Sequence, residues 1–351
     1  MTTLGARARV TLLDVAAAAE VDPSTVSRVI RGMNQRVSDE TRERIIRVAA
    51  ELGYVANANA RSLVSSETMT LGLLIPNLAG FVYSDVIRGA VTAAREAGYI
   101  LVVVDASEIG TTSDAFHRMV LEGRVDGLLI ASGTVTDTLA DELLRQSGRC
   151  IILNRLIESS QPSIIEDDDA GMRLGVEELI RVGHTRIACL AGPADVDTSR
   201  RRLAGYRSAM TTAALEPPED YVVYAGYEES GGYTGMTRLL ELDTPPTGVA
   251  AVSLAGAIGA LAACRAAGVR VPEDLSMVAF HDAPIAEFLS PPLTTVSMPL
   301  FELGQQATKL LVKLLKGESI PSTSKVTEPT PSLVARSSIA APRVGPLTIW
   351  R

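Results

Sequence analysis

A short segment near the start of the chain, VDPSTVSRVIRG (residues 21–32), combines small hydroxyl side chains with arginine on one side of a predicted helix. Asp22 is a good N-cap and Pro23 suits the first helical position, so the helix is expected to begin there. Its apolar side is formed by Val26, Val29 and Ile30. Its polar side carries Ser24, Thr25, Ser27 and Arg28. Such hydroxyl and guanidinium groups can bind phosphates and base edges in the major groove of DNA.

Two further helices are predicted around this one. Thr11 and Asp14 have the spacing of a capping box and begin an alanine-rich helix that ends near Ala19. Ser38 caps a third helix, which ends at Gly53. Two short helices joined by a tight turn and followed by a third are typical of a helix-turn-helix domain. The alternative is a small bundle whose polar face is only solvated.

Composition limits the possible functions of the 351-residue chain. The formal net charge is −8, yet residues 1–65 hold nine Arg against seven Asp and Glu, which indicates a small basic module on an acidic body. The sequence has neither a long apolar run nor a signal peptide, so we expect a cytoplasmic protein with no membrane partner. The three cysteines lie far apart in apolar runs and are expected to be buried, reduced thiols: Cys150, Cys189 and Cys264.

From residue 70 onward, apolar runs alternate with amphipathic helical segments. Nine strands are predicted, from MTLGLLIP (69–76) to LSMVAFHD (275–282). This alternation favours parallel sheets covered on both faces, and its length favours two open α/β subdomains. Ligands of such folds lie beyond the carboxyl ends of the strands, here in the cleft between the subdomains.

An ordered series of segments resembles the LacI/GalR family of bacterial transcription regulators. The series includes VTLLDVAAAAEVDPSTVSRVIRG, VSDETRERI, AAELGYVANANARSL, LGLLIPNLAGFVYSDVIRGAVTAAREAGY and TPSLVARSSI. The resemblance covers nearly the whole chain. It implies an all-α helix-turn-helix DNA-binding head and an α/β periplasmic-binding-protein-like core of two open, doubly wound subdomains.

The resemblance also implies domain boundaries. We expect the head at 1–56, a hinge helix and linker at 57–69, the effector-binding and dimerisation core at 70–341 and a tail at 342–351. The N-subdomain would comprise 70–165 and 299–325, and the C-subdomain 166–297 and 326–341. The three chain crossings are expected near 166–170, 296–299 and 321–330.

In the family, the second helix of the head lies in the major groove and a hinge leucine, here Leu63, enters the minor groove. The expected DNA-binding residues are Thr11, Pro23, Ser24, Thr25, Ser27, Arg28, Asn57, Arg61 and Leu63. Glu20 departs from the family, which usually has glycine in this turn. If Glu20 is left-handed, its conformation costs about 1 kcal/mol.

For the effector, the resemblance implies residues that follow the strands. The expected set is Val82, Tyr83, Asn154, Arg155, Arg200, Tyr227, Ser253 and His281. Arg200 is expected to hold ligand hydroxyls or a carboxylate. Ser253 with Leu254, and His281, stand where relatives often have Asn-Asp and aspartate. His281 could donate to an anionic group, switch charge near neutral pH, or bond Asp282 without touching the ligand.

The sequence therefore predicts a dimeric, ligand-responsive transcription regulator, a repressor that binds a near-palindromic operator as a homodimer. The expected effector is a sugar or sugar derivative, and a nucleobase or nucleoside is the rival. No cofactor and no metal are expected, although EDDDAG (166–171) could suggest a metal site. The alternatives are a solute-binding protein without DNA function, a regulator that has lost its ligand response, and an α/β enzyme. No P-loop, nucleophile elbow or dinucleotide motif supports the enzyme.

Overall fold

The computed structural model describes residues 10–30, 37–54, 67–78, 80–105, 122–131, 149–156, 161–345 and 347. The chain divides into two compact units, a head of residues 1–68 and a core of residues 69–351. Among the helices of the described ranges, none combines the length and the apolar character that a membrane crossing requires.

The head is a bundle of three short helices, α1 (Leu12–Ala18), α2 (Pro23–Ile30) and α3 (Asp39–Glu51). The predicted caps are confirmed: Thr11 and Asp14 form a capping box, and Ser38 accepts a hydrogen bond from the amide of Thr41. At the start of α2, Asp22 accepts from the amide of Ser24 at 2.8 Å. Seven buried residues form the core of the bundle: Val15, Ala16, Ala19, Val26, Val29, Ile45 and Ala49.

The turn between α1 and α2 has the left-handed residue that the sequence suggests. Glu20 has a φ of 51°, a region that glycine occupies without a steric penalty and glutamate does not. The departure at Glu20 therefore stores strain of about 1 kcal/mol, which the packing of the three helices outweighs.

The N-subdomain contains a parallel sheet with the strand order β11-β5-β4-β3-β1-β2 within the described residues. Its strands are β1 (Thr70–Ile75), β2 (Ile100–Asp105), β3 (Gly127–Ile130), β4 (Cys150–Leu153), β5 (Ser163–Ile165) and β11 (Thr323–Lys325). Helices α5 (Tyr83–Glu96) and α12 (Leu300–Leu315) pack against each other. Their backbones approach so closely that a Cβ on Gly89 would lie 1.9 Å from the carbonyl oxygen of Phe301.

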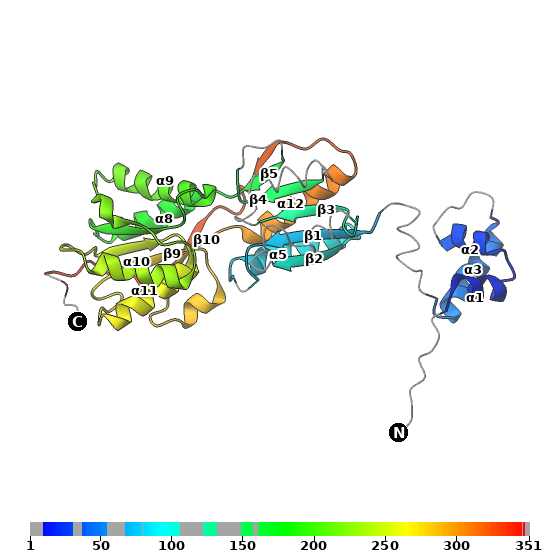
Figure 1. The fold of residues 1–351 in the computed structure, drawn as a ribbon, viewed down its shortest axis with the longest axis horizontal. Helices are drawn as coiled ribbons and strands as arrows, with labels where there is room; N and C mark the ends of the chain where they lie inside the picture. The colour runs from blue at the N-terminus through cyan, green and yellow to red at the C-terminus, as the bar shows by residue number, and fades with distance from the viewer. Residues whose placement is uncertain are drawn as a thin grey trace, which may run out of the picture. The chain divides into compact units, whose positions relative to one another are not determined.

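The C-subdomain contains a second sheet, with the order β12-β10-β9-β8-β6-β7. Its strands are β6 (Ile187–Ala191), β7 (Val222–Tyr224), β8 (Gly248–Ala251), β9 (Ser276–Phe280), β10 (Thr294–Ser297) and β12 (Ser332–Val334). Only β12 runs antiparallel to its neighbour in the described part of this sheet. Helices α8 (Asp168–Arg181) and α9 (Asp197–Thr212) pack together on one side, and α10 (Glu229–Leu240) packs with α11 (Leu254–Ala266) on the other (Figure 1). Two short 3₁₀ helices, η1 (Glu219–Tyr221) and η2 (Pro284–Phe288), complete the described elements.

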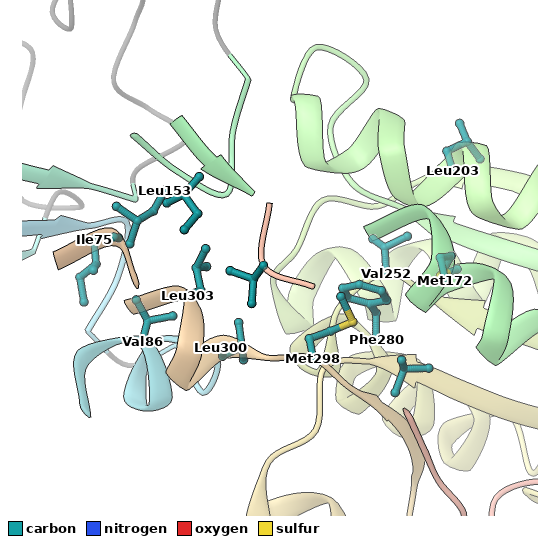
Figure 2. Close-up of a cluster of buried hydrophobic side chains, with 14 of the residues drawn as sticks. Ile75, Val86, Leu153, Met172, Leu203, Val252, Phe280, Met298, Leu300 and Leu303 are labelled. Atoms are coloured by element: carbon teal, nitrogen blue, oxygen red, sulfur yellow. The ribbon is translucent and has the colours of Figure 1, made fainter. Parts of the chain in front are cut away.

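The chain passes between the two sheets three times within the described residues. The crossings lie between β5 and α8, between β10 and α12, and between β11 and β12. Figure 2 shows that Met298 and Leu300 lie at the second crossing, between apolar side chains of both subdomains. They belong to one buried cluster that extends from Leu153 in the N-subdomain to Phe280 in the C-subdomain. Apolar packing therefore continues through the crossings.

Three strands differ from the prediction. The nine strands predicted from apolar runs do not include β10, β11 and β12, whose sequences are TTVS, TSK and SLV. These strands are short and contain polar residues, so hydrophobic periodicity does not reveal them. They adjoin the second and third crossings: β11 and β12 lie at the edges of their sheets, and β10 lies between β12 and β9.

Candidate functional site

In the head, the face of α2 opposite its buried valines carries the predicted DNA-binding residues. Ser24 and Arg28 are exposed, while Pro23, Thr25 and Ser27 are half-buried. The Arg28 Nη2 donates to the Ser24 Oγ at 2.9 Å, and the (i, i+4) spacing of these residues places them on one helix face. Thr11 is exposed at the start of α1. The remaining three predicted residues, Asn57, Arg61 and Leu63, lie outside the described residues.

In the core, a cavity of about 350 Å³ lies between the subdomains at the carboxyl ends of their strands. Residues that follow four strands line it: Asn77 after β1, Asn154 after β4, Ser253 after β8 and His281 after β9. The volume falls in the range of about 300–1,000 Å³ that is usual for small-molecule pockets. The cavity therefore stands where open α/β sheets bind their ligands.

The structure brings seven of the eight predicted effector residues to this cavity. They are Val82, Tyr83, Asn154, Arg155, Tyr227, Ser253 and His281. Tyr83 comes from α5 of the N-subdomain, and burial raises the pKa of its hydroxyl. Asn154 and His281 have φ angles of 50° and 70°, so two strand ends at the cavity are in the left-handed region. Such backbone conformations cluster at functional sites.

The structure does not bring Arg200 to the cavity. Its side chain is exposed, and its Nη1 donates to the backbone carbonyl of Asp195 at 3.2 Å. Instead Arg202, two residues further along α9, lines the cavity together with Thr198. Residues two apart on a helix point about 200° away from each other, so the choice between neighbouring arginines decides which one faces the ligand. The buried Leu203 and Tyr206 give the helical phase that could have identified Arg202 from the sequence.

Arg202 is held rigidly by three kinds of contact. Its Nε donates to Asp168 Oδ1 at 2.7 Å, and its Nη1 donates to the carbonyl of Val252 at 2.9 Å. Its guanidinium lies 4.3 Å from the centre of the Phe280 ring, and its Nη2 lies 3.5 Å from His281 Nε2. A guanidinium has five N–H groups, so two of them have no protein partner among the described residues. The side chain is buried and can donate two hydrogen bonds to a ligand.

The side chains of His281 and Ser253 both contact other groups of the protein. Ser253 caps α11 by accepting from the amide of Gly256, and it donates to the carbonyl of Tyr227 at 2.8 Å. Burial, and then the positive charge of Arg202, hold the pKa of His281 well below its ordinary value, so its imidazole is neutral near pH 7. This disfavours the hypothesis of a charge switch at His281. Asp282 has other partners, Thr295 at 2.6 Å and Arg336 at 2.9 Å.

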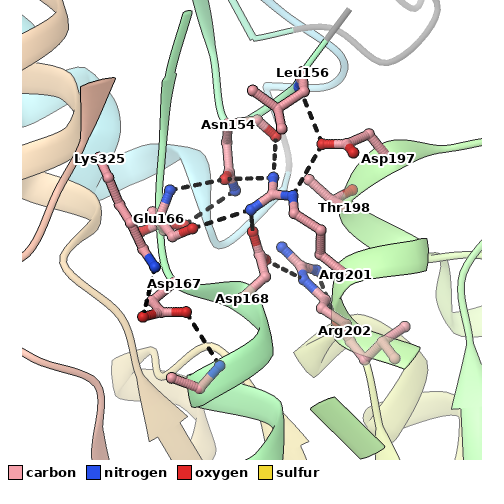
Figure 3. A network of polar contacts seen from close by, with 12 residues as sticks. Asn154, Leu156, Glu166, Asp167, Asp168, Asp197, Thr198, Arg201, Arg202 and Lys325 are labelled. Atoms are coloured by element: carbon pink, nitrogen blue, oxygen red, sulfur yellow. Dashed lines mark hydrogen bonds and ion pairs between the residues drawn. The ribbon is translucent and has the colours of Figure 1, made fainter. Parts of the chain in front are cut away.

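Three of the four carboxylates of the EDDDAG segment are bound by protein groups. Asp167 caps α8 and pairs with Lys325 at 2.8 Å, while Asp168 pairs with Arg201 and Arg202. Glu166 Oε2 accepts from Asn154 Nδ2 at 3.0 Å (Figure 3). In the described part of the chain, no group of acidic, histidine or cysteine side chains is arranged to hold a metal ion. The cysteines are free and buried, as predicted, and burial raises their thiol pKa to about 12.

Glu166 is fully buried, and its Oε1 has no hydrogen-bond partner within the described part of the chain. Burial, and then the neighbouring Asp168, raise the pKa of Glu166 to about 8, against the opposing effect of Arg202 and Arg201; Glu302 raises it further. Because the folded state then holds a proton that the unfolded chain releases near pH 4.5, stability should fall as the pH rises from about 4.5 to 8.

Replacing Glu166 with Gln removes this proton. We expect the decline in unfolding free energy over that pH range to become shallower than in the wild type, by up to about 1.4 kcal/mol per pH unit. Urea unfolding at a series of pH values measures the slope. Glu178→Gln is the matched control, because its exposed pairing with Arg181 lowers the pKa of Glu178 and acts below this range. An unchanged slope in Glu166→Gln would rule out the buried proton.

Comparison with known proteins supports both units of the fold. Residues 11–57 match the family model of bacterial regulatory proteins of the lacI family, and residues 176–339 match that of the periplasmic binding protein-like domain. The chain is 31% identical over 331 residues to the HTH-type transcriptional repressor PurR of Vibrio atlanticus, covering 94% of this chain and 98% of the relative.

Two solved structures are similar over almost the whole length. One is the lac repressor dimer bound to operator and the anti-inducer ONPF, with 29% identity, a TM-score of 0.81 and coverage of 95% of this chain and all of the other. The other is the transcriptional regulator CelR in complex with cellobiose, with 32% identity, a TM-score of 0.70 and coverage of 94% and 100%.

Head, core and relatives together define a DNA-binding transcription regulator, not an enzyme. The chain belongs to the LacI family of bacterial regulatory proteins. Repressors of this family bind operator DNA and small-molecule effectors.

Proposed function

We propose that this protein is a repressor whose operator affinity is controlled by a small molecule bound in the cavity between its core subdomains. The observation that carries the proposal is Arg202, a buried guanidinium with two unused N–H groups at a cavity beyond the strand ends. A buried cation without a full set of partners is favourable where a ligand supplies the missing acceptors. The effector would contact Arg202, Tyr83, Asn154, Arg155 and Tyr227, with Val82, Ser253 and His281 completing the wall.

A sugar or sugar derivative is the effector class we favour. Ring hydroxyls can accept from Arg202 and donate to Glu228 and Asp282, which also line the cavity. The ring of Tyr227 offers an apolar face for the C–H side of a sugar, and its hydroxyl is fixed by Thr198 at 2.7 Å. The similar CelR structure holds cellobiose, which supports the same class by analogy.

A nucleobase or nucleoside is the second candidate, and the cavity has a feature that favours it. Ser253 uses its hydroxyl within the protein, Leu254 is apolar and His281 is neutral, so this wall offers few acceptors for hydroxyl groups. Tyr83 and Tyr227 approach from the two subdomains and could pack against a flat ring.

Calorimetric titration of the full chain against pentoses, hexoses, cellobiose and nucleosides distinguishes the two classes. Saturable binding of a sugar that Arg202→Gln removes supports the first class, and the same result with a nucleoside supports the second. If nothing binds, the alternative of a regulator without ligand response is favoured.

We infer that two copies act together on DNA. A twofold dimer fits a near-palindromic operator, and each α2 would enter one major groove. The hinge residues Asn57, Arg61 and Leu63 would add contacts in the minor groove. Closure of the cleft around an effector would then change the relative position of the N-subdomains of the two copies. A coupling free energy of about 1–3 kcal/mol changes operator affinity several-fold to about a hundred-fold.

Replacing Arg28 with Ala should weaken operator binding by about 1–3 kcal/mol, which is about 5- to 150-fold, and relax specificity at one base pair. The physical reason is that its guanidinium, bonded to Ser24, is already oriented on the exposed face of α2. Gel-shift titration against single-base variants of a selected duplex measures both effects. Arg42→Ala is the control, since Arg42 pairs with Asp39 at 2.8 Å on α3. Equal losses in the two variants would contradict the assignment.

A further inference from the structure

The side chain of Arg201 connects the two subdomains beside the cavity without lining it. From α9 of the C-subdomain, its Nη2 donates to the carbonyl and Oδ1 of Asn154, at 3.1 and 3.3 Å, at the end of β4 in the N-subdomain. Its Nη1 donates to the carbonyl of Glu166 at 3.0 Å, at the first crossing. One guanidinium thus holds the end of an N-subdomain strand and the crossing segment to a C-subdomain helix (Figure 3).

A carboxylate on α9 reinforces the same connection. Asp197 Oδ2 accepts from Arg201 Nε at 2.9 Å and from the backbone amide of Leu156 at 3.0 Å. Leu156 belongs to the segment that follows β4. We call this set the interdomain clamp: Arg201, Asp197, Asn154, Leu156 and the carbonyl of Glu166. The Arg201 side chain is 17% exposed and that of Asp197 is 11% exposed, so water competes little for these bonds.

The interdomain clamp shares a carboxylate with the residue expected to hold the effector. Asp168 has a fully buried side chain, and its two oxygens have different partners: Oδ2 pairs with Arg201 Nη1 and Oδ1 with Arg202 Nε at 2.7 Å. When a ligand accepts hydrogen bonds from the unused N–H groups of Arg202, it draws that guanidinium toward the cavity and changes the strength of its ion pair with Asp168. The ion pair between Asp168 and Arg201 changes in the opposite sense, because one carboxylate binds both cations.

We propose that Arg201 is the positioning residue that transmits the occupancy of Arg202 through Asp168 to the end of β4, and so sets the coupling between effector and operator. The proposal rests on the proposed function for the part that concerns the effector. The clamp itself requires only the contacts of the effector-free protein. Arg201 does not line the cavity, so it should act on the response and not on the affinity of the cavity.

The first test uses amide exchange in the full chain without any effector. In Arg201→Gln, we expect exchange at Leu156 to rise at least about tenfold, because a shorter, uncharged side chain replaces the guanidinium that orients the Asp197 carboxylate accepting from this amide. Arg200→Gln is the matched control: it alters the preceding residue, whose side chain is exposed and outside the clamp. Unchanged protection of Leu156 in Arg201→Gln would overturn the clamp.

The second test measures coupling. The full chain binds a duplex that the wild type selects from a random-sequence pool, with and without D-ribose, cellobiose or adenosine as probes. For a probe that shifts the wild-type operator affinity, Arg201→Gln should bind that probe within about threefold of the wild type and yet shift operator affinity less than twofold. Equal losses of probe affinity and response would overturn the positioning role, as would a full response.

Arg201→Lys covers the case in which Arg201→Gln does not fold. Lysine keeps a positive charge for Asp168 but has no planar guanidinium that could also reach Asn154. The Arg201→Lys variant should therefore fold, and its operator affinity should still not respond to the probe. A wild-type level of both protection and response in Arg201→Lys would contradict the proposal. If no probe shifts the operator affinity of the wild type, the effector assignment fails for these probes, and the exchange measurement still tests whether the interdomain clamp exists.

Discussion

Replacing Arg202 with Gln is expected to abolish the effect of the ligand on operator binding and to weaken ligand binding by at least about 30-fold. A hydrogen bond to a charged group contributes about 1.5–3 kcal/mol, and the ligand loses both of its donors on this side chain. The protein should still fold, because Asp168 keeps a second arginine, Arg201. The amide nitrogen of glutamine is as many bonds from Cα as Nε of arginine, so it also keeps a donor for Asp168 Oδ1.

Calorimetry with the ligand found in the panel, and gel shifts with and without it, measure the two effects of Arg202→Gln. Operator binding in the absence of ligand should remain within a few-fold of the wild type, which also shows that the chain is folded. Arg200→Gln is the control, and it should bind and respond as the wild type does. A retained response in Arg202→Gln would indicate that the ligand binds outside this cavity.

Replacing Leu63 with Ser is expected to weaken operator binding by about 100-fold or more while leaving ligand affinity of the free protein nearly unchanged. A leucine wedge that unstacks one base step contributes a few kcal/mol by letting the bent duplex contact more protein, and serine cannot fill that space. Leu63 lies outside the described residues, so the expectation comes from the resemblance of NANARSLV to the family hinge.

Gel-shift and calorimetric titrations separate the two effects of Leu63→Ser. Leu63→Met is the conservative control: it keeps an apolar wedge and should retain most of the operator affinity. If Leu63→Ser lost ligand affinity and operator affinity equally, the hinge assignment would be refuted, because the defect would then lie in the fold.

The three described helices of the head could be predicted from the sequence, because local chemistry determines them. The capping residues Thr11 and Ser38, and Pro23 in the first turn of α2, act within a few residues of their own positions. The regular alternation of the core likewise predicts nine of the described strands, β1 to β9. Strands β10 to β12 were not predicted, because each is short and is placed in its sheet by neighbouring strands rather than by an apolar pattern of its own.

The candidate site was predictable to the level of which strand ends face the cavity. The resemblance assigned the ligand role to Arg200, but Arg202 lines the cavity, because the helical phase of α9 decides which arginine faces it. The interdomain clamp has no sequence signal. Arg201 meets Asn154, Glu166 and Asp168 only after the chain has crossed between the subdomains.

We propose that the head binds specific duplex DNA and that effector binding in the core controls this binding. The most direct measurement is binding of the full chain to fragments of its own chromosome at several salt concentrations, with and without the sugar and nucleoside panel. We predict that a few fragments bind with a steep, linear fall of log affinity against log salt, and that at least one compound shifts this binding several-fold or more. Failure to bind any fragment, with or without these compounds, would contradict the account.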